Sequence, residues 1–421
     1  MSAAILTIGT ELTRGELVDT NATWLASSLT ALGFTVGEIA TVDDDREHIR
    51  DAIRRLAAAF PVLLVTGGLG PTTDDMTAES AAAAAGVLLT RDAGSIEAIR
   101  RRLATLGRAL TASNEKQADV PLGAEVLGNP AGTAPAFKLR IGSCDAFFLP
   151  GVPREMRHIF EELIVPRIGP LASADSYQIV LRTYGLPESL LGERLDGLEA
   201  QYPTLTIGYR ASYPEVEVKI FVRNGDRTSS HALAEVIAND VRARLGDHVY
   251  GEGDDTFAGA VGRGLRARGF TLAVAESCTG GLIGALLTSV AGSSDYLLVD
   301  AVTYSNSAKE RLLGVPAETL IAHGAVSPEC VRAMADGVRR MSSADVAIAV
   351  TGIAGPSGGS AEKPVGLVHF AIVSPTGVEV TQKVFPGDRQ RVQRGAAYFA
   401  LGLVRAVCAG PVSAGLVPGC G

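Results

Sequence analysis

Short apolar runs alternate with helical patterns through most of this chain of 421 residues. Within residues 3–165, the apolar runs Ala3–Ile8, Phe34–Val42 and Val62–Val65 are separated by the helical patterns Asn21–Leu32 and Asp45–Phe60. Such alternation is typical of a parallel sheet that helices cover on both faces. The pattern returns in residues 256–409. There we expect a last helix from about Asp388 and strands at 271–275, 297–303, 345–351, 365–373 and 378–385.

The segment between these two stretches has a different order. Strands at 177–182, 205–210 and 216–222 combine with helices at 188–202 and 229–245. This order predicts a small α+β module, either ferredoxin-like or KH-like. A KH domain that clamps nucleotides needs a GxxG loop, which Gly208 and Gly225 do not supply, so we expect a structural or interfacial role. With a linker ending at 175, the predicted domains are 1–168, 175–250 and 256–410, followed by a flexible tail at 411–421.

Composition excludes several classes of protein. The chain is 47% hydrophobic and 20% charged, which is typical of globular domains. Its net charge of −8 gives no reason to expect direct nucleic-acid binding. No apolar run reaches the roughly 18 residues that a membrane helix needs, and we expect no membrane partner. The five cysteines are widely spaced, and the N-terminus shows no signal-peptide pattern, so we expect a cytoplasmic location.

Two segments of the C-terminal region suggest nucleophilic chemistry. Ser277 and Cys278 follow an apolar run and precede a helical pattern, so they should lie on a strand-to-helix turn. Tyr304 and Lys309 follow the next apolar run. Ser277 can be a nucleophile, Lys309 a base if burial lowers its pKa, and Tyr304 a proton relay. The backbone N–H groups of Thr279, Gly280 and Gly281 are expected to face an oxyanion or a phosphate.

Each of these residues also has an ordinary structural interpretation. Ser277 or Thr279 can simply cap the following helix, and Lys309 can be a solvated surface lysine. Cys278 is a rival nucleophile, although a small buried residue is the commoner role of an isolated cysteine. From spacing alone these structural alternatives are slightly favoured.

A glycine-rich loop and an arginine extend the predicted C-terminal site. The segment Thr351–Gly359 follows an apolar run and has the glycine density of a loop that approaches a ligand, with Thr351, Gly352 and Gly355 as candidate contacts. Arg389 opens the last helix and can meet a phosphate, whereas Asp388 beside it can be an N-cap.

The N-terminal region has its own glycine-rich turn, Val65–Asp75, between a strand and a helix. Its glycines permit close approach to a phosphate, and its two aspartates offer the hard oxygen ligands that Mg²⁺ prefers. The same aspartates can instead complement the helix dipole. We predict substrate contacts at Gly68, Gly70, Thr72 and Asn129, and metal ligands at Asp74, Asp75, Glu11 and Asp19.

Together these motifs resemble the CinA family, the competence/damage-inducible proteins, from about residue 3 to 409. In the N-terminal and middle regions the matching segments are 9–12, 18–21, 66–75, 149–156 and 185–189. In the C-terminal region they are 275–281, 302–306, 323–327, 351–356 and 387–389.

The resemblance implies a molybdopterin-binding-like N-terminal α/β domain that acts as a metal-dependent ADP-ribose pyrophosphatase, using Mg²⁺, Mn²⁺ or Co²⁺. It also implies a C-terminal α/β amidohydrolase domain, without a cofactor, that converts nicotinamide mononucleotide (NMN) to nicotinic acid mononucleotide and ammonia. In that deamidase the nucleophile corresponds to Ser277, assisted by Tyr304 and Lys309. Family members resemble homodimers. The alternative is a binding protein for a molybdopterin-type ligand, or a competence-associated scaffold, with one or both sites inactive.

Overall fold

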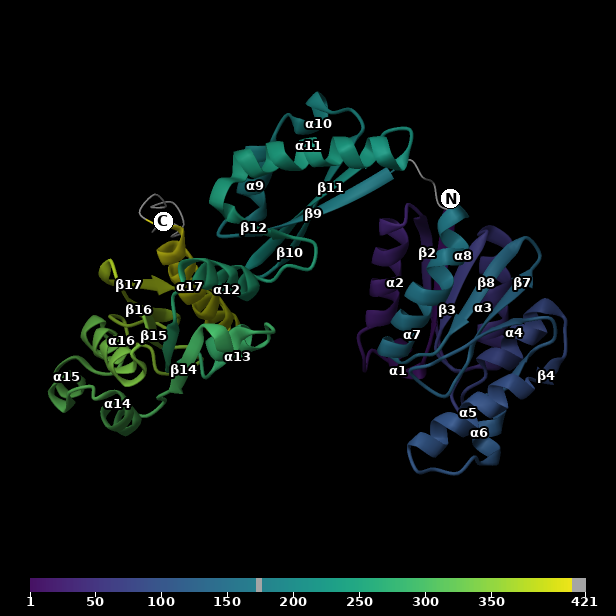
Figure 1. The fold of residues 1–421 in the computed structure, drawn as a ribbon, viewed down its shortest axis with the longest axis horizontal. Coiled ribbons are helices and arrows are strands. Elements are labelled where there is room, and N and C mark those ends of the chain that lie inside the picture. Colours follow the sequence, from purple (N-terminus) through teal and green to yellow (C-terminus); the bar gives the residue numbers. More distant parts are fainter. Residues whose placement is uncertain (172–175, 411–421) are drawn as a thin grey trace. The chain divides into compact units, whose positions relative to one another are not determined.

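Two separate units make up the fold. The first consists of Met1–Tyr177 with Gly225–Arg227, and the second of Gln178–Asn224 with the chain from Thr228 onward. The computed structural model describes residues 1–171 and 176–410 (Figure 1). The predicted tail at 411–421, and residues 172–175 of the predicted linker, lie outside the described residues.

The first unit is built on a six-stranded sheet with the order β2-β1-β3-β8-β7-β6. Strands β1, β2, β3 and β8 run parallel, so their carboxyl ends meet at one edge. The strands are β1 (Ser2–Ile8), β2 (Thr35–Val42), β3 (Val62–Thr66), β6 (Glu125–Leu127), β7 (Ala136–Ile141) and β8 (Cys144–Leu149). A separate antiparallel pair consists of β4 (Leu89–Arg91) and β5 (Asp119–Pro121).

Helices cover both faces of this sheet, as predicted (Figure 1). Ile53 and Leu56 of α3 pack on one face, and Leu25 of α2 with Ile159 of α7 packs on the other. The helices are α1 (Thr10–Thr13), α2 (Thr20–Ala31), α3 (Arg46–Ala59), α4 (Thr77–Ala85), α5 (Ala93–Thr105), α6 (Ala112–Lys116), α7 (Pro153–Ile159) and α8 (Val165–Ile168), with a π-helical turn Phe160–Ile164 between the last two and a 3₁₀ turn Gly169–Leu171 after them.

The middle module is a four-stranded sheet with the order β10-β11-β9-β12, accompanied by helices, and this confirms the predicted α+β class. The helix expected over 188–202 is broken at Gly197, whose φ of 79° is left-handed. The strands are β9 (Ser176–Tyr184), β10 (Leu205–Ser212), β11 (Glu215–Arg223) and β12 (Val249–Glu252). The helices are α9 (Glu188–Leu195), α10 (Leu198–Gln201) and α11 (Arg227–Leu245), followed by a 3₁₀ turn Gly246–His248.

The C-terminal module has a five-stranded sheet with the order β14-β13-β15-β16-β17. Its strands are β13 (Leu272–Glu276), β14 (Leu297–Val302), β15 (Val346–Gly352), β16 (Leu367–Ser374) and β17 (Gly377–Val384). Val274 and Ile348 face a core under α12, α13 and α17, whereas Ala275 and Ala349 face a core under α14, α15 and α16 (Figure 1). The helices are α12 (Phe257–Arg268), α13 (Leu282–Thr288), α14 (Asn306–Leu313), α15 (Ala317–His323), α16 (Pro328–Ser342) and α17 (Arg389–Ala409), with a 3₁₀ turn Ser293–Asp295.

The expectation of wholly parallel sheets is wrong at one side of each α/β sheet. Strands β7 and β8 are antiparallel, as are β16 and β17. Two residues separate the strands in each pair, and a parallel connection needs a crossover of a dozen residues or more. The short links therefore force hairpins there, while the strands at the predicted sites remain parallel.

A half-buried carboxylate, Glu215, joins the middle module to the C-terminal module. Glu215 of β11 accepts hydrogen bonds from Tyr250 of β12 and from Tyr398 of α17, the latter at 2.7 Å. The Tyr398 ring also stacks on Phe257 of α12, with ring centroids 5.5 Å apart. Burial raises the pKa of Tyr398, and the hydrogen bond to Glu215 raises it further, so the phenol stays a donor. The middle module therefore packs on the C-terminal module through satisfied polar contacts and aromatic rings.

Replacing Glu215 by alanine should destabilise the second unit. Two phenol hydroxyls would lose their acceptor, which costs about 1–3 kcal/mol in the free energy of unfolding. Urea unfolding followed by circular dichroism measures the loss. The fluorescence of Trp24, the only tryptophan, reports the first unit and should not shift. The exposed strand residue Glu379 gives the matched control Glu379→Ala, and equal stability of the two variants would contradict the assignment.

Candidate active site

Ser277 lies on a sharp turn between β13 and α13. Gly280 and Gly281 have φ values of 66° and 95°, in the left-handed region that favours glycine, and they bring the chain back over the end of β13. Helix α13 begins after Gly281 without any side-chain cap. The interpretation of Ser277 or Thr279 as a helix cap is therefore wrong.

Lys309 reaches Ser277 from the neighbouring strand end. Strands β13 and β14 are parallel and adjacent, and Lys309 follows β14 on the first turns of α14. Its Nζ donates to Ser277 Oγ at 3.0 Å and to the carbonyl oxygen of Thr303 at 2.7 Å. Lys309 is 1% exposed and Ser277 is 8% exposed. The interpretation of Lys309 as a solvated surface lysine is therefore wrong.

The environment of Lys309 favours its neutral form. None of the described carboxylates forms an ion pair with it, and burial lowers the pKa of its ammonium group below the ordinary 10.5. When Lys309 is neutral, its lone pair can accept the proton of Ser277 Oγ across the same 3.0 Å contact. The pair therefore has the distance and the electrostatics of a nucleophile with its base.

Cys278 has the properties of a buried residue rather than of a nucleophile. It is buried, and burial raises the pKa of its thiol to about 12, so the reactive thiolate is scarce at neutral pH. Its carbonyl oxygen accepts a hydrogen bond from Gln393 Nε2 at 2.8 Å. Gln393 lies one turn after Arg389 on α17, a spacing that could have identified it from the sequence.

The backbone N–H groups of Gly280 and Gly281 are not free for an oxyanion, contrary to the prediction. Gly280 N donates to Ser277 O at 3.1 Å, and Gly281 N donates to Glu276 Oε2 at 2.9 Å. Among the described residues, no group accepts from the backbone N–H of Cys278 or Thr279. The side-chain hydroxyl of Thr279 is also buried and unpartnered. The backbone N–H groups of Cys278 and Thr279 are therefore available to a ligand.

Tyr304 lies at the rim of this site. It is 59% exposed, and its Oη accepts a hydrogen bond from Arg389 Nη2 at 2.6 Å rather than meeting Ser277 or Lys309. Its contact with Lys309 is through its own carbonyl oxygen, at 3.5 Å from Lys309 Nζ. The predicted role of the Tyr304 hydroxyl as a proton relay has no hydrogen bond to support it in this geometry.

The second glycine-rich loop closes the same edge of the sheet. Gly355 has a φ of 81°, and its carbonyl oxygen accepts from Arg389 Nη1 at 3.0 Å. Thr351 Oγ1 donates to the carbonyl oxygen of Ala325 at 2.8 Å, and a Cβ atom at Gly352 would lie 2.6 Å from Leu367 O. Thr351 and Gly352 thus hold the loop in place. Asp388 caps α17 as expected, accepting from Arg391 N, and so orients Arg389.

The predicted N-terminal residues gather on loops at one sheet edge, but their carboxylates do not form one cluster. Asp75 Oδ2 accepts from Thr72 N at 2.9 Å, and a Cβ at Gly70 would collide with Asp75. Asn129 Nδ2 donates to Glu155 Oε2 at 2.7 Å, and Gly68 packs on Thr77. Within residues 1–171 and 176–410, no three His, Cys, Asp or Glu side chains are placed to hold a metal ion.

Two acceptor oxygens at the start of α2 are nevertheless unsatisfied. Asp19 Oδ1 caps the helix by accepting from Ala22 N at 2.8 Å, whereas Asp19 Oδ2 and Asn21 Oδ1 are buried and unpartnered. Asn21 Nδ2 donates to the carbonyl oxygen of Gly151 at 2.7 Å, which ties α2 to the loop after β8. These oxygens suit a hard cation that takes its remaining ligands from a bound phosphate, as Mg²⁺ commonly does. Lys116, which the sequence analysis missed, donates to the carbonyl oxygens of Thr72 and Asp75.

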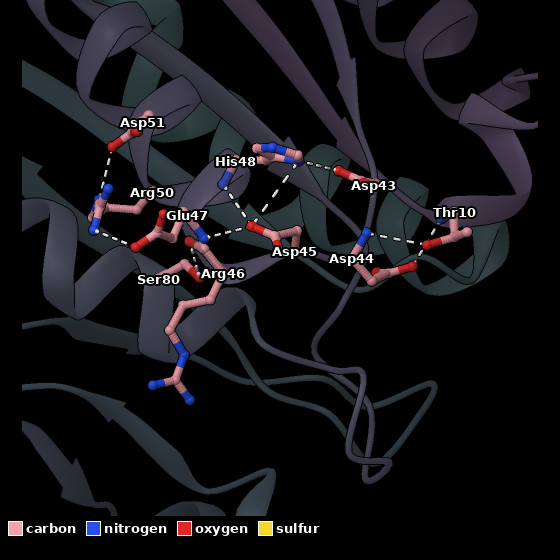
Figure 2. Close-up of polar contacts among 10 residues, drawn as sticks. All are labelled: Thr10, Asp43, Asp44, Asp45, Arg46, Glu47, His48, Arg50, Asp51 and Ser80. Atoms are coloured by element: carbon pink, nitrogen blue, oxygen red, sulfur yellow. Dashed lines mark hydrogen bonds and ion pairs between the residues drawn. The ribbon is translucent and has the colours of Figure 1, made fainter.

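Figure 2 shows a polar network at the ends of β1 and β2 that the sequence analysis also missed. Thr10 N donates to Asp44 Oδ2 at 2.8 Å, which joins the loops carrying Glu11 and Asp45. Asp45 caps α3, and His48 contacts Asp43 at 2.7 Å. The hydrogen bond to Asp43 raises the pKa of His48. The network fixes the loop that carries the predicted ligand Glu11, whose carboxylate folds over Gly9.

Three protein families match successive parts of the chain. A probable molybdopterin binding domain matches residues 4–170, the damage-inducible protein CinA KH domain matches 178–251, and the CinA C-terminal domain matches 254–408. The KH match covers the middle module, although this module lacks the nucleotide-clamping GxxG loop. Among the described helices, none is both long enough and apolar enough to cross a membrane.

Full-length relatives agree with these matches. A "CinA-like protein" of Anaeromyxobacter dehalogenans (strain 2CP-1 / ATCC BAA-258) is 44% identical over 407 residues, covering 96% of this chain and 99% of that protein. A "CinA-like protein" of Geobacter sulfurreducens (strain ATCC 51573 / DSM 12127 / PCA) is 45% identical, covering 96% of this chain and 98% of that protein. A solved competence/damage inducible protein from Agrobacterium tumefaciens is 43% identical over 36% of this chain and 93% of its own, with a TM-score of 0.35.

The buried amine of Lys309 should make the stability of the protein depend on pH. Its native pKa lies below the unfolded value of 10.5, so between the two the unfolded chain binds more protons and stability rises with pH. The free energy of unfolding of the wild type minus that of Lys309→Met should therefore grow by up to about 1.4 kcal/mol per pH unit in that window. Urea titrations at several pH values measure this difference. A difference that stays constant with pH would mean that Lys309 is not buried as a neutral amine.

Proposed function

The chain belongs to the CinA family, and from that premise we propose that its C-terminal module hydrolyses the carboxamide of NMN, giving nicotinic acid mononucleotide and ammonia. The observation that supports this proposal is the 3.0 Å contact between Ser277 Oγ and the buried, unpaired Lys309 Nζ. Amide hydrolysis by a serine needs such a base, because a hydroxyl is a weak nucleophile until its proton is removed.

The proposed reaction proceeds in two halves. Ser277 Oγ attacks the carboxamide carbon while Lys309 Nζ accepts the hydroxyl proton, and the oxyanion lies against the backbone N–H groups of Cys278 and Thr279. Lys309 then gives the proton to the amide nitrogen, the C–N bond breaks, and ammonia leaves an ester on Ser277. Water gives a proton to the neutral Lys309 and attacks that ester, the bond to Ser277 Oγ breaks, and Lys309 returns the proton to Ser277 Oγ as the acid leaves.

We assign the phosphate end of NMN to the part of the rim where Arg389 and Tyr304 lie. Arg389 supplies a guanidinium at the start of α17, a position suited to a phosphate. Its hydrogen bonds to Tyr304 Oη and Gly355 O hold it at the mouth of the site. Tyr304 thus belongs with substrate binding in this proposal. Leu298 and Val302 are exposed on the edge strand β14 beside it, a surface that a second copy of the chain would cover in the proposed homodimer.

Replacing Ser277 by alanine should abolish ammonia release from NMN, because the nucleophile is lost. Lys309→Ala should lower kcat far more than it changes KM, because the base acts only in the transition state. The activity of the wild type should rise with pH until Lys309 is neutral. An enzyme-coupled ammonia assay with mass spectrometry of the product tests this. Ser289→Ala, at the exposed end of α13, is the matched control and should retain wild-type activity. Undiminished release by Ser277→Ala would rule the mechanism out.

For the N-terminal domain, we propose metal-dependent cleavage of ADP-ribose to AMP and ribose 5-phosphate. The specific observation that favours it is the pair of unsatisfied buried oxygens of Asp19 and Asn21 near the glycine-rich turn after β3. Two protein oxygens with the pyrophosphate of the substrate can complete the coordination of Mg²⁺, Mn²⁺ or Co²⁺. The metal, when bound, would polarise the phosphoryl oxygens, and the glycines leave backbone space for the phosphates.

The variant Asp19→Asn tests this second activity without breaking the fold. Asparagine keeps the cap of α2 through its Oδ1 but replaces the unpartnered oxygen by an amide nitrogen. AMP release should fall at least about tenfold with unchanged thermal stability, as expected for loss of a metal ligand. The control Asp92→Asn alters another N-cap of the same unit, which accepts from Ser95 N, and should leave AMP release unchanged. Activity that survives EDTA would refute the metal requirement.

A further inference from the structure

Two carboxyl groups, one buried and one half-buried, lie beneath the turn that carries Ser277. Glu276 is the last residue of β13 and is 0% exposed. In the parallel pairing of β13 with β14, Val274 is opposite Asp300 and Glu276 is opposite Val302. Glu276 and Asp300 therefore project from the same face of neighbouring strands, two positions apart. No step of the proposed reaction uses either group.

Glu276 clamps both ends of the turn. Its Oε2 accepts from Gly281 N at 2.9 Å, and its Oε1 accepts from Gly284 N at 3.0 Å. Between these anchors, Gly280 N closes on Ser277 O at 3.1 Å. With those N–H groups occupied inside the turn, the N–H groups of Cys278 and Thr279 are the ones left for an oxyanion. The orientation of the proposed oxyanion donors thus depends on the Glu276 carboxylate.

Asp300 of β14 packs against the Glu276 carboxylate. Among the described residues, no group donates to its buried Oδ1. The strand register places Glu276 on the same face beside it, and burial together with this neighbour raises the pKa of Asp300. A hydrogen bond between the two carboxyl groups requires that one of them carries a proton. A Cβ atom at Gly284 would lie 2.0 Å from Asp300 Oδ2, so glycine at this position makes the close approach of Asp300 feasible. The close approach of Asp300 to the turn therefore depends on its position on β14 and on the glycine at position 284 of α13.

We infer that Glu276 and Asp300 share one proton and act together as positioning residues for Ser277 and its oxyanion donors. Two carboxylates in contact cannot both ionise without strong repulsion in a buried site. Burial and the neighbouring Glu276 raise the pKa of Asp300, so the pair keeps a proton above the pH at which an isolated aspartate ionises.

The other charged groups near the turn interact with residues other than Asp300. Helix α13 has no titratable side chain, and Asp295, ahead of β14, is paired with Arg266 at 3.1 Å. Lys309 and Arg389 both act on the Cys278 thiol, whose pKa is raised by burial despite these two cations. Glu276 is the one charged group among the described residues that shifts Asp300. We therefore treat the titration of Glu276 and Asp300 as a property of this pair alone.

The shared proton predicts a second limb in the pH profile. As pH rises, Lys309 becomes neutral and activity increases. Above the apparent pKa of the pair, Asp300 ionises, repels Glu276 and loosens the clamp on Gly281 and Gly284. Ionisation of the pair should then lower kcat by up to about tenfold per pH unit relative to a variant whose residue 300 cannot ionise, and it opposes the rise that the deprotonation of Lys309 produces. This kinetic consequence rests on the proposed amidohydrolase activity, whereas the titration of the pair does not.

The variant Asp300→Asn tests the inference. Its amide N–H donates to Glu276 at every pH and cannot ionise, so this lowering of kcat should disappear while the rise due to Lys309 remains. Asp295→Asn, an exposed carboxyl at the start of the same strand, is the control and should keep the wild-type profile. A purely structural role for Asp300 would lower activity equally at all pH values, and that result would overturn the inference.

A readout that needs no activity uses the full chain with ¹⁵N-labelled glycine. In the wild type, the amide signals of Gly281 and Gly284 should shift together with a midpoint near the pKa of the pair, and in Asp300→Asn they should not. Amide signals in the wild type that do not titrate would overturn the inference. Titrating amides in a protein that releases no ammonia from NMN would support the shared proton and refute the proposed function, so the two failures are distinguishable.

Discussion

The Lys309 amine is buried, and no carboxylate among the described residues pairs with it. The proposed chemistry depends on this constraint. A buried ammonium costs free energy unless it is paired, so the site favours the neutral base. The same burial holds Nζ within 3.0 Å of Ser277 Oγ and 2.7 Å of Thr303 O. Both contacts follow from two adjacent parallel strands that end at the same edge of the sheet. The pairing of β13 with β14 thus brings the proposed nucleophile and its proposed base together, and burial lowers the pKa of Lys309.

A second buried group on the opposite side of the turn complements the first. Lys309 acts on the Ser277 hydroxyl, whereas Glu276 acts on the backbone that follows it, through Gly281 N and Gly284 N. Both groups are buried, and each makes hydrogen bonds that hold the turn carrying Ser277. In this account the deprotonation of the base raises activity with pH, and the ionisation of the clamp lowers it. The pH range of activity is then set by Lys309 on one side of the turn and by the Glu276–Asp300 pair on the other.

Sequence reasoning located the strand ends but not the use of each hydrogen bond. Apolar runs before Ser277 and Lys309 were enough to predict that two strand ends meet, because strand ends of a parallel sheet share an edge. The roles of Gly280 and Gly281 were predicted wrongly, because only coordinates show that Glu276 and Ser277 already accept from their N–H groups. Asp300 gave no signal, since one carboxylate within an apolar strand looks like a solvent-facing residue. The antiparallel hairpins at β7–β8 and β16–β17 were missed because the two-residue links were not weighed against the need for a crossover.

The most direct test of the central claim is the titration of Lys309 itself. In protein with ¹³C- and ¹⁵N-labelled lysine, the Lys309 signal, assigned by its loss in Lys309→Met, reports the protonation of Nζ. The account predicts a midpoint clearly below 10.5 that coincides with the acid limb of kcat for ammonia release from NMN. A midpoint at or above 10.5, or one that does not match the acid limb, would contradict the assignment of Lys309 as the base for Ser277.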